Sequence, residues 1–361
     1  MHIYCNAIVN AGQGKVNVTE KGRQKLKAGK ISETVLKRSV LKAVNGQLKQ
    51  KSASKAGVGV DAGLFAVPEH NGTMAAASAA VAGNAVGMAE LAVYRACNSL
   101  AAAGAVPVAV TVQLVLPESM EEDGLKQTMQ EILAACEKTG VLLNEGHTQI
   151  SPLVAERVVS VTAIGMAAGT AALHETVAGS ELVMTKTAGL AGAVLLAETY
   201  REALHERYTY AFIDKARTRR EEISVLREAK MLKEAGIVHM HDIAEGGVFG
   251  AVWELAERLQ AGVEMDLKKI PILQETVEIS EYFDVNPYQL RGDGALLFLT
   301  HDSALIIEKL AELGIPAAVI GRMTEGNDRI LVNEEEVRHL EPNRVEEYER
   351  AVQRMREQKG E

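Results

Sequence analysis

The chain has 361 residues, of which 47% are hydrophobic and only 4% aromatic, and it carries a net charge of −9. This length is enough for two domains with an aliphatic, alanine-rich core, and the negative charge argues against general nucleic-acid binding. The charge is uneven, because the segment from Lys15 to Lys55 holds twelve Lys or Arg residues and only two acids. That segment has a charge of +10 and the remainder −19, so it forms either an arm that folds over a phosphate ligand or a solvated basic surface.

The three cysteines, Cys5, Cys97 and Cys136, form no CxxC pair, and this pattern predicts reduced thiols in a cytoplasmic protein. Cys97 and Cys136 fall in helical patterns, so we expect them in the core. The longest apolar stretch, Met74 to Ala109, is interrupted by polar residues. Since no basic N-terminal region leads into an apolar segment either, the sequence predicts neither a signal peptide nor a membrane span.

Residues 1–55 are predicted to form a basic arm that contains one helix. Residues 3–9 fit a short strand, and the glycines and lysines that follow are typical of a mobile arm. Ser32 then precedes a capped amphipathic helix with apolar residues Val35, Leu36, Val40 and Leu41. Residues 45–55 are polar and lysine-rich, which predicts a loop.

A first α/β domain is predicted over residues 56–168. It opens with a strand entered through glycines, with Asp61 at its mouth. The further predicted elements are a helix at 84–104, a strand at 108–116, a helix at 121–139, a strand at 141–143 and a strand at 157–166. The strand at 141–143 is expected to lead into a turn made by Glu145-Gly146-His147-Thr148. Residues 169–179 are predicted to link the two halves.

A second α/β domain is predicted over residues 178–335. Its predicted strands lie at 181–186, 263–267, 295–299, 317–320 and 329–332, and its helices at 189–200, 221–235, 248–259, 275–283 and 304–313. Because helix follows helix between 190 and 235, the pattern indicates two mixed α/β (α+β) halves rather than one doubly wound sheet. After a break at Pro342-Asn343, residues 342–361 are predicted to form a charged, largely solvated helical tail.

The stretch His239-Met240-His241-Asp242-Ile243-Ala244-Glu245-Gly246-Gly247 has the layout of a strand, an acidic turn, a glycine pair and a helix. Glycines at a helix start let the backbone approach an anion closely, and the free N–H groups and the helix dipole there favour it. Asp242 is placed to hold a cation on such an anion, so magnesium bound to a polyphosphate is one interpretation. The alternative is a capped helix start that binds nothing.

Two further glycine-rich segments carry an Asp or His beside glycine: Gly59-Val60-Asp61-Ala62-Gly63 and the segment around His147; Asp293 is a weaker case. Oxygen ligands on such turns suit magnesium bound to phosphates. His147 is a candidate metal ligand or general base, or else a turn histidine bonded to the backbone. Lys186, at the end of its strand, either neutralises a phosphate or is a surface lysine.

His239 and His241 are two residues apart and would share one face of an extended segment, but a solvated turn is their expected setting. The sequence contains no HExxH or CxxC-type site that would support a two-histidine metal centre. It also contains no GxSxG and no GxxxxGK[ST], which argues against hydrolase and Walker-type functions.

The segment from Val238 to Leu299 carries the clearest likeness to a known family. Its motifs are His241-Asp242-Ile243-Ala244-Glu245-Gly246-Gly247, Trp253-Glu254-Leu255-Ala256, Ile270-Pro271, Asn286-Pro287 and Gly294-Ala295-Leu296-Leu297. Looser matches are Gly29-Lys30, Gly146-His147-Thr148 and Thr185-Lys186 with Gly189. With these motifs the chain resembles the aminoimidazole ribonucleotide synthetase (PurM-like) superfamily, and within it the HypE-like group of hydrogenase maturation factors.

This resemblance implies a two-domain PurM-like fold and a homodimer whose N-terminal sheets pair into a barrel, with ATP in a cleft near the interface. Members use ATP to phosphorylate an oxygen or similar acceptor. Asp61 matches an acidic metal ligand, and His147 stands where many members have a polar residue near the nucleotide. Asp242, Gly246 and Gly247 match the nucleotide-side loop of the second domain.

Three departures from the family pattern lie in the first domain. Val60, not a second acid, precedes Asp61; Ser78 is the one polar candidate on a strand expected to bear Asp; and Asn98-Ser99 replaces an Asn-Asp pair. The sequence also ends Gln358-Lys359-Gly360-Glu361, without the cysteine that carries the thiocarboxamide in HypE. We therefore expect no hydrogenase cyanide-ligand synthesis by that route.

The sequence thus supports two functional hypotheses. In the first, the chain is a cytoplasmic, homodimeric enzyme that uses Mg–ATP to phosphorylate an unidentified small molecule, with no nucleic-acid or membrane partner. Asp61, His147 and Asp242 would hold magnesium, with His147 and Asp242 catalytic; Gly59, Asp61, Lys186, Gly246 and Gly247 would bind the nucleotide. In the second, the chain is a catalytically degenerate relative that serves as a nucleotide-binding or protein-interaction dimer.

Overall fold

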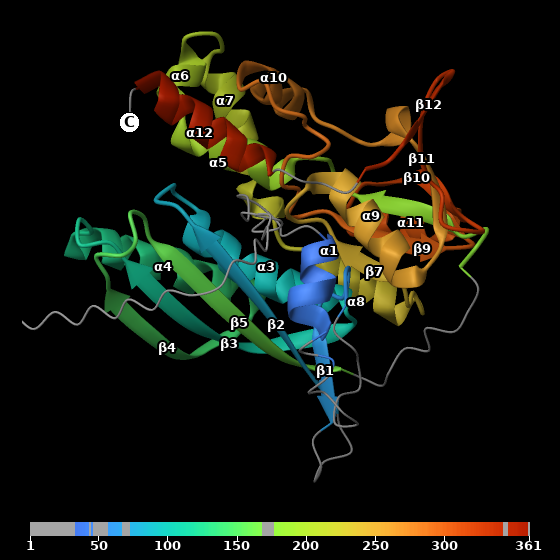
Figure 1. Cartoon of the computed structure of the whole chain (residues 1–361), viewed down its shortest axis with the longest axis horizontal. Coiled ribbons are helices and arrows are strands. Elements are labelled where there is room, and N and C mark those ends of the chain that lie inside the picture. The colour runs from blue at the N-terminus through green and yellow to red at the C-terminus, as the bar shows by residue number, and fades with distance from the viewer. Residues whose placement is uncertain are drawn as a thin grey trace, which may run out of the picture.

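The computed structural model describes residues 33–42, 45, 57–66, 73–167, 177–341 and 346–359 (Figure 1). The strand expected at 3–9, all but the first residue of the loop expected at 45–55, most of the linker expected at 169–179 and the break at Pro342-Asn343 lie outside these ranges. A helical segment made by α1 (Glu33–Leu36) and η1 (Lys37–Leu41) lies where the sequence predicts the helix of the arm.

A five-stranded sheet with the order β1-β2-β5-β3-β4 forms the first domain. Its strands pair antiparallel except for β3 and β4, which run parallel. Figure 1 shows α3 and α4 over one face of this sheet. The elements are β1 (Gly63–Ala66), β2 (Thr73–Ala82), α3 (Met88–Ala102), β3 (Ala105–Leu116), α4 (Glu122–Thr139), β4 (Leu142–Ile150) and β5 (Val158–Ala167).

Side chains of this first sheet alternate in burial. Along β5, Val159, Val161 and Ala163 are buried, whereas the residues between them are more exposed. The less buried face presents Val106 and Met166, which pair across β3 and β5. Such alternation is typical of a sheet with helices on one face. The sheet is open in the single chain, so the pairing of two sheets into a barrel stays a prediction.

The prediction of a turn around His147 is wrong. Residues 142–150 form the edge strand β4, and His147 pairs with Gln113 of β3. The glycine before His147 suggested a turn, but a polar run on an exposed edge strand has no buried face to reveal its period.

A seven-stranded sheet with the order β12-β11-β8-β10-β6-β9-β7 forms the second domain. Its strands are β6 (Glu181–Thr185), β7 (Met240–Asp242), β8 (Gly262–Asp266), β9 (Leu296–Thr300), β10 (Ala317–Thr324), β11 (Arg329–Asn333) and β12 (Glu336–His339). Its helices are α5 (Leu190–Thr199), α6 (Arg201–His205), α7 (Tyr210–Thr218), η2 (Arg219–Glu222), α8 (Leu226–Glu234), α9 (Gly247–Leu259), η3 (Leu267–Lys269), α10 (Gln274–Tyr282) and α11 (Ser303–Glu312). None of the helices in the described ranges is both long and apolar enough to cross a membrane.

Helix α3 lies between the two domains and is buried on nearly all sides. Fourteen of its fifteen residues are buried, and Ser99 is the exception. Its sequence is apolar around most of the helix, which is typical of a helix covered from several directions. Cys97 packs in a core cluster that contains residues of both domains, for instance Val161 and Leu195. Ala101 and Ala102 pack with further residues of the second domain. Helix α3 is therefore the element through which the domains share a core.

The C-terminal helix α12 (Glu347–Lys359) forms where the charged helical tail is predicted, but its first turns are docked rather than solvated. Tyr348 and Ala351 are buried in the same core cluster as Phe283. Arg354 donates to the carbonyl oxygens of Phe283 and Asp284. The high charge of this segment concealed one apolar stripe that packs on the end of α10.

Candidate functional site

A cavity of about 440 Å³ lies where loop 57–61, α3 and the β7–α9 connection meet. Small-molecule sites typically have volumes of roughly 300–1,000 Å³. Acidic residues predominate among the described residues that line it, namely Glu33, Asp61, Asp242, Glu245 and Glu254, against Arg95 and His241. Negative charge repels a polyphosphate, so such a ligand requires bound cations in this cavity.

The β7–α9 connection forms one wall, and its glycine pair is explained by the backbone. Gly246 precedes α9 with φ +86, and Gly247 begins the helix with φ +60. A Cβ on Gly247 would lie 2.4 Å from the carbonyl oxygen of Tyr288, so a larger residue does not fit there. The cavity runs along the flank of α9, lined by Gly250, Trp253 and Glu254 at helical spacing.

Asp242 lies at the end of β7, where its carboxylate is buried and lines the cavity. It accepts a hydrogen bond from the Ser99 hydroxyl at 3.1 Å. Burial, and next the negative charge of Asp61, raise the pKa of Asp242 to about 7. The carboxylate therefore lacks a positive partner strong enough to offset its burial, and a cation in the cavity would supply one.

His241 is buried beside Asp242, so the solvated turn expected for it is wrong. Its Nδ1 lies 2.7 Å from Asp61 Oδ1, and its Nε2 lies 3.3 Å from Glu254 Oε2. Burial, the largest single influence, lowers the pKa of His241, but the negative charge of Asp61 and the contacts with Asp61 and Glu254 together outweigh it and raise the pKa to about 9. The carboxylates come from another domain and another element, so the spacing of two histidines did not reveal this setting.

Asp61 reaches the cavity through close packing of the glycine-rich loop on α9. Gly59 has φ +68, and a Cβ there would lie 2.2 Å from the carbonyl oxygen of Glu254. The loop thus needs glycine at this position for its own packing. The second oxygen of Asp61 accepts from Arg258 Nη1 at 3.2 Å. The carboxylate is therefore held from two sides, by His241 and by Arg258.

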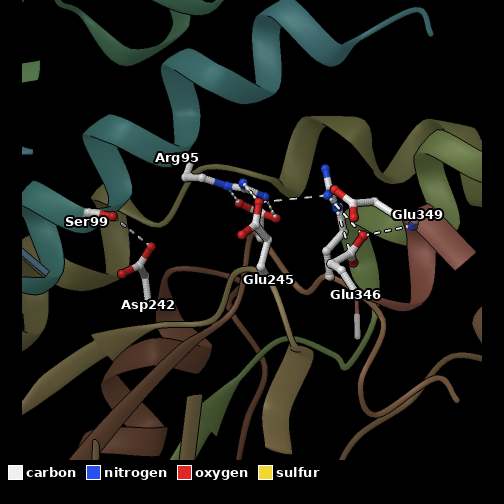
Figure 2. Close-up of polar contacts among 8 residues, drawn as sticks. Arg95, Ser99, Asp242, Glu245, Glu346 and Glu349 are labelled. Atoms are coloured by element: carbon white, nitrogen blue, oxygen red, sulfur yellow. Dashed lines mark hydrogen bonds and ion pairs between the residues drawn. The ribbon is translucent and has the colours of Figure 1, made fainter. Parts of the chain in front are cut away.

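A buried charge network extends from α3 to the C-terminal helix (Figure 2). Arg95 donates to both oxygens of Asp293 at 2.7 and 3.0 Å and to Glu245 at 2.7 Å. Arg291 lies 4.0 Å from Glu245 and donates to Glu346 at 3.1 Å. Nothing in the sequence indicated this role, because Arg95 is only one of the polar residues that interrupt an apolar stretch. Glu245, which lines the cavity, is thus fixed by residues of both domains.

Family models match both domains of the chain. The N-terminal domain of AIR synthase related protein matches residues 59–167, and its C-terminal domain matches residues 177–333. The chain belongs to the AIR synthase related family. Its relatives and structural neighbours also bear out the HypE-like resemblance.

Three curated relatives of this AIR synthase related chain carry hydrogenase-related names. A protein of Methanocaldococcus jannaschii named for hydrogenase expression and formation is 25% identical over 67% of this chain and 72% of its own length. The carbamoyl dehydratase HypE of Rhizobium leguminosarum is 26% identical over 64% and 67%. The carbamoyl dehydratase HypE of Escherichia coli is 23% identical over 65% and 70%.

Solved structures with the same fold include HypE and ThiL proteins. Escherichia coli HypE aligns with a TM-score of 0.66 at 19% identity, covering 77% of this chain and 88% of that one. A HypE solved in complex with ATP gives 0.65 at 18% identity, covering 90% and 98%. AaThiL complexed with AMPPCP and TMP gives 0.61 at 19% identity, covering 76% and 87%. These likenesses show the mixed α/β, two-domain PurM-like fold.

Serines occupy two of the three first-domain positions where the family resemblance led us to expect acids. Ser78, on β2, lines the cavity and lies 2.8 Å from the hydroxyl of Thr162. Ser99, on α3, lines it as well and donates to Asp242. In this AIR synthase related chain the first-domain wall therefore contributes hydroxyl groups and one carboxylate, Asp61.

The structure does not bring every predicted site residue to the cavity. Among its described lining residues are Gly59, Asp61 and Asp242, but not His147, Lys186 or the pair Gly246-Gly247. His147 is exposed on the sheet edge formed by β4. The roles predicted for these residues remain predictions.

Lys186 is neither at the cavity nor on the surface. Its ammonium group donates to the carbonyl oxygens of Glu222 and Ser224 at 2.9 and 2.7 Å and lies 2.6 Å from Glu228 Oε1. The backbone at Lys186 has φ +53, which is uncommon for a residue with a side chain. These contacts tie β6 to the η2–α8 connection and already balance the lysine charge.

The donor set fits a divalent cation. Single ligand atoms of Asp61, His241 and Asp242 all lie within 4.8 Å of one another. The His241 Nδ1 atom is buried and, despite the nearby Asp61, makes no hydrogen bond of normal geometry. A metal ion there would neutralise the buried Asp242 carboxylate and displace the proton from His241 Nδ1, whose lone pair would then bind the metal.

Proposed function

We propose that this chain is an ATP-dependent enzyme that transfers a phosphoryl group to a small-molecule acceptor at the cavity between its domains. The observation that carries this proposal is the meeting of Asp61 and Asp242 on opposite walls of a cavity of about 440 Å³. The shared fold of the HypE solved with ATP and the ThiL solved with AMPPCP and TMP supports it.

The residues of the cavity have distinct roles in this proposal. Asp61 and Asp242 hold the magnesium that accompanies the nucleotide, since carboxylate oxygens are the ligands that magnesium prefers. Magnesium, when bound, offsets the negative charge of the phosphates and of the acidic lining. Glu245, fixed by Arg95, and Ser99, which holds Asp242, keep the second-domain wall in place. Catalysis would then come from positioning and electrostatic stabilisation.

Calorimetry of ATP binding with and without magnesium tests this proposal. We expect magnesium-dependent binding to the full chain, followed by acceptor-dependent release of ADP in a screen of small metabolites. A chain that binds no nucleotide at any magnesium concentration would not be such an enzyme.

A second candidate function is a non-catalytic dimer that binds a nucleotide or a partner protein. Two observations favour this second candidate. The Asp61 carboxylate is already paired with His241 and Arg258, and Ser78 and Ser99 replace expected acids. In this case nucleotide binding would persist, while ADP release would stay at the background rate with every acceptor.

We also propose that two copies pair through the open faces of their first-domain sheets. Support comes from the exposed apolar residues that share this face, Val106, Leu142 and Met166. A cluster of exposed apolar side chains on a single chain is typical of an interaction surface. Light scattering should give twice the mass of one chain for the wild type, and Val106→Asp should lower the measured mass to that of one chain. A wild-type monomer would contradict the pairing.

A further inference from the structure

The cavity contains a set of three potential metal ligands that includes a nitrogen atom. Asp61 comes from the first domain, and His241 and Asp242 are consecutive residues of β7. The ligand atoms lie within 4.8 Å of one another. A cation bound at roughly 2.0–2.2 Å from nitrogen and oxygen ligands holds neighbouring ligand atoms roughly 3 Å apart. The 2.7 Å between His241 Nδ1 and Asp61 Oδ1 is close to this spacing.

The imidazole is oriented so that one nitrogen remains available. Its Nε2 lies 3.3 Å from Glu254 Oε2, while its buried Nδ1 has no hydrogen bond of normal geometry. Histidine ligands of metals almost always bond a carboxylate, carbonyl or water through the other ring nitrogen. Glu254 therefore fixes the ring and directs Nδ1 toward Asp61.

Each of the two carboxylates also accepts a hydrogen bond from a further side chain. Arg258 Nη1 donates to Asp61 Oδ2 at 3.2 Å, which turns Oδ1 toward His241. Ser99 donates to Asp242 Oδ2 at 3.1 Å. Each of the three ligands is thus held by one further side chain, which is the arrangement expected around a metal centre. In a cluster of acidic residues on a protein surface, each carboxylate would not be held by a further side chain in this way.

We infer that this site selects a first-row transition dication such as Zn²⁺ over Mg²⁺. Magnesium prefers oxygen ligands and near-ideal octahedral geometry, whereas imidazole suits zinc and its neighbours. The inference rests on the proposed function for the place of the metal beside the nucleotide, and it replaces magnesium as the preferred ion at Asp61 and Asp242. It changes the role of His241 from a buried histidine to a metal ligand that selects the ion.

The single tryptophan of the chain allows the site to be monitored directly, because Trp253 lines the same cavity. Chain stripped with a chelator is titrated with Zn²⁺, Mn²⁺ or Mg²⁺ alone, in calorimetry and in tryptophan fluorescence. We expect one site with the affinity order Zn²⁺, Mn²⁺, Mg²⁺, and zinc at least about tenfold tighter than magnesium. The spin-echo spectrum of bound Mn²⁺ should show coupling to one imidazole nitrogen.

Variants identify the nitrogen ligand. His241→Asn should weaken zinc binding at least about 10- to 100-fold, the range seen when even outer partners are lost, and abolish the nitrogen coupling. His301→Asn, at an exposed histidine beside Ser180, is the matched control and should bind zinc like wild type. If His241→Asn does not fold, Ser99→Ala serves instead, since it keeps all three ligands and should weaken zinc binding less.

Three outcomes would overturn the inference: equal affinity for magnesium and zinc, nitrogen coupling that persists in His241→Asn, or zinc binding unchanged by both His241→Asn and Ser99→Ala. These titrations contain no nucleotide, so their result is independent of the ATP experiment. A chain that selects zinc but binds no ATP would refute the proposed function alone. A chain that binds ATP with magnesium and ignores zinc would refute this inference alone.

Discussion

The two walls of the cavity differ in how their charges are compensated. On the second-domain wall, Asp242 is buried with one neutral donor, Ser99, and its pKa is raised. On the first-domain wall, Asp61 is held by the cationic side chain of Arg258 and by His241. One carboxylate still needs a positive partner, and the other already has two.

This difference separates what maintains the site from what determines its chemistry. The second-domain wall retains the strand, turn and helix that the family motif predicts, and it supplies the uncompensated carboxylate. The first-domain wall has Ser78 and Ser99 where acids were expected, and His241 adds a nitrogen between the walls. Any change of metal or of reaction relative to other members would therefore arise where the first domain meets β7.

The largest expected effect comes from separating the two walls at Arg95. Arg95→Leu leaves Asp293 buried without its bidentate partner and frees Glu245. Breaking a buried ion pair in this way costs about 3–5 kcal/mol of unfolding free energy. Urea denaturation followed by circular dichroism measures the loss.

The matched control for this variant is Arg322→Ala, which removes an exposed pair with Glu264. Exposed pairs contribute about 1 kcal/mol or less, so the control should unfold nearly like wild type. Arg95→Leu combined with Asp293→Leu should recover part of the loss, because no buried charge is then left unpaired. Equal effects of Arg95→Leu and Arg322→Ala would show that the buried network does not join the walls.

The second-domain wall was predictable because its signal is local. Asp242, the glycine pair and the apolar spacing that follows lie within one short segment, and α9 begins at Gly247 as expected. The setting of His241 was not predictable, because it depends on Asp61 from the other domain and on Glu254. Arg95 escaped notice for the same reason, since its partners Asp293 and Glu245 are distant in sequence.

The fold shows the same division between local and long-range signals. The apolar patterns located most helices and strands to within a few residues, for instance α4 (Glu122–Thr139). The edge strand β4 was taken for a turn because both of its faces are exposed around His147. The docking of α12 was missed because only its first turns are buried, at Tyr348 and Ala351, within a highly charged sequence. Helices α6 and α7 were not foreseen, and the strand order required the structure.

The pH dependence of stability tests the uncompensated charge of Asp242. Its pKa is raised to about 7, so the folded chain retains a proton that the unfolded chain releases near pH 4. The stabilisation is complete below about pH 4 and is lost as the pH rises through about 7, at most about 4 kcal/mol in total. Relative to Asp242→Asn, the unfolding free energy of wild type should therefore fall across this range.

These denaturation curves are recorded with a chelator present, because a bound cation would stabilise the ionised carboxylate. His241 adds a later effect of the same sign, since its pKa is raised from 6.5 to about 9 and its contribution is lost as the pH approaches 9. A wild-type curve parallel to that of Asp242→Asn between pH 4 and 7 would mean that Asp242 is already compensated.

Nucleotide binding compares the two walls directly. Asp242→Ala removes the carboxylate that we propose holds the metal, so Mg–ATP binding should weaken by at least about 10- to 100-fold, the range seen when even outer partners of metal ligands are lost. Ser99→Ala keeps the carboxylate and removes only its donor, so its loss should be smaller. Both are measured by calorimetry at one magnesium concentration. Unchanged affinity in Asp242→Ala would refute its role on the second-domain wall.

The smallest expected effect is that of His147→Asn, on the sheet edge remote from the cavity. His147 is exposed on β4 and pairs with Gln113, and it is absent from the described residues that line the cavity. Exposed substitutions change free energies by about 0.5 kcal/mol or less, so Mg–ATP affinity should change by less than about threefold. A tenfold loss would require the edge strand of a second copy to reach the cavity, and the first-domain wall would then be made by two chains. The same calorimetry on a monomeric Val106→Asp background separates these cases, because only a contribution from a second copy disappears with the dimer.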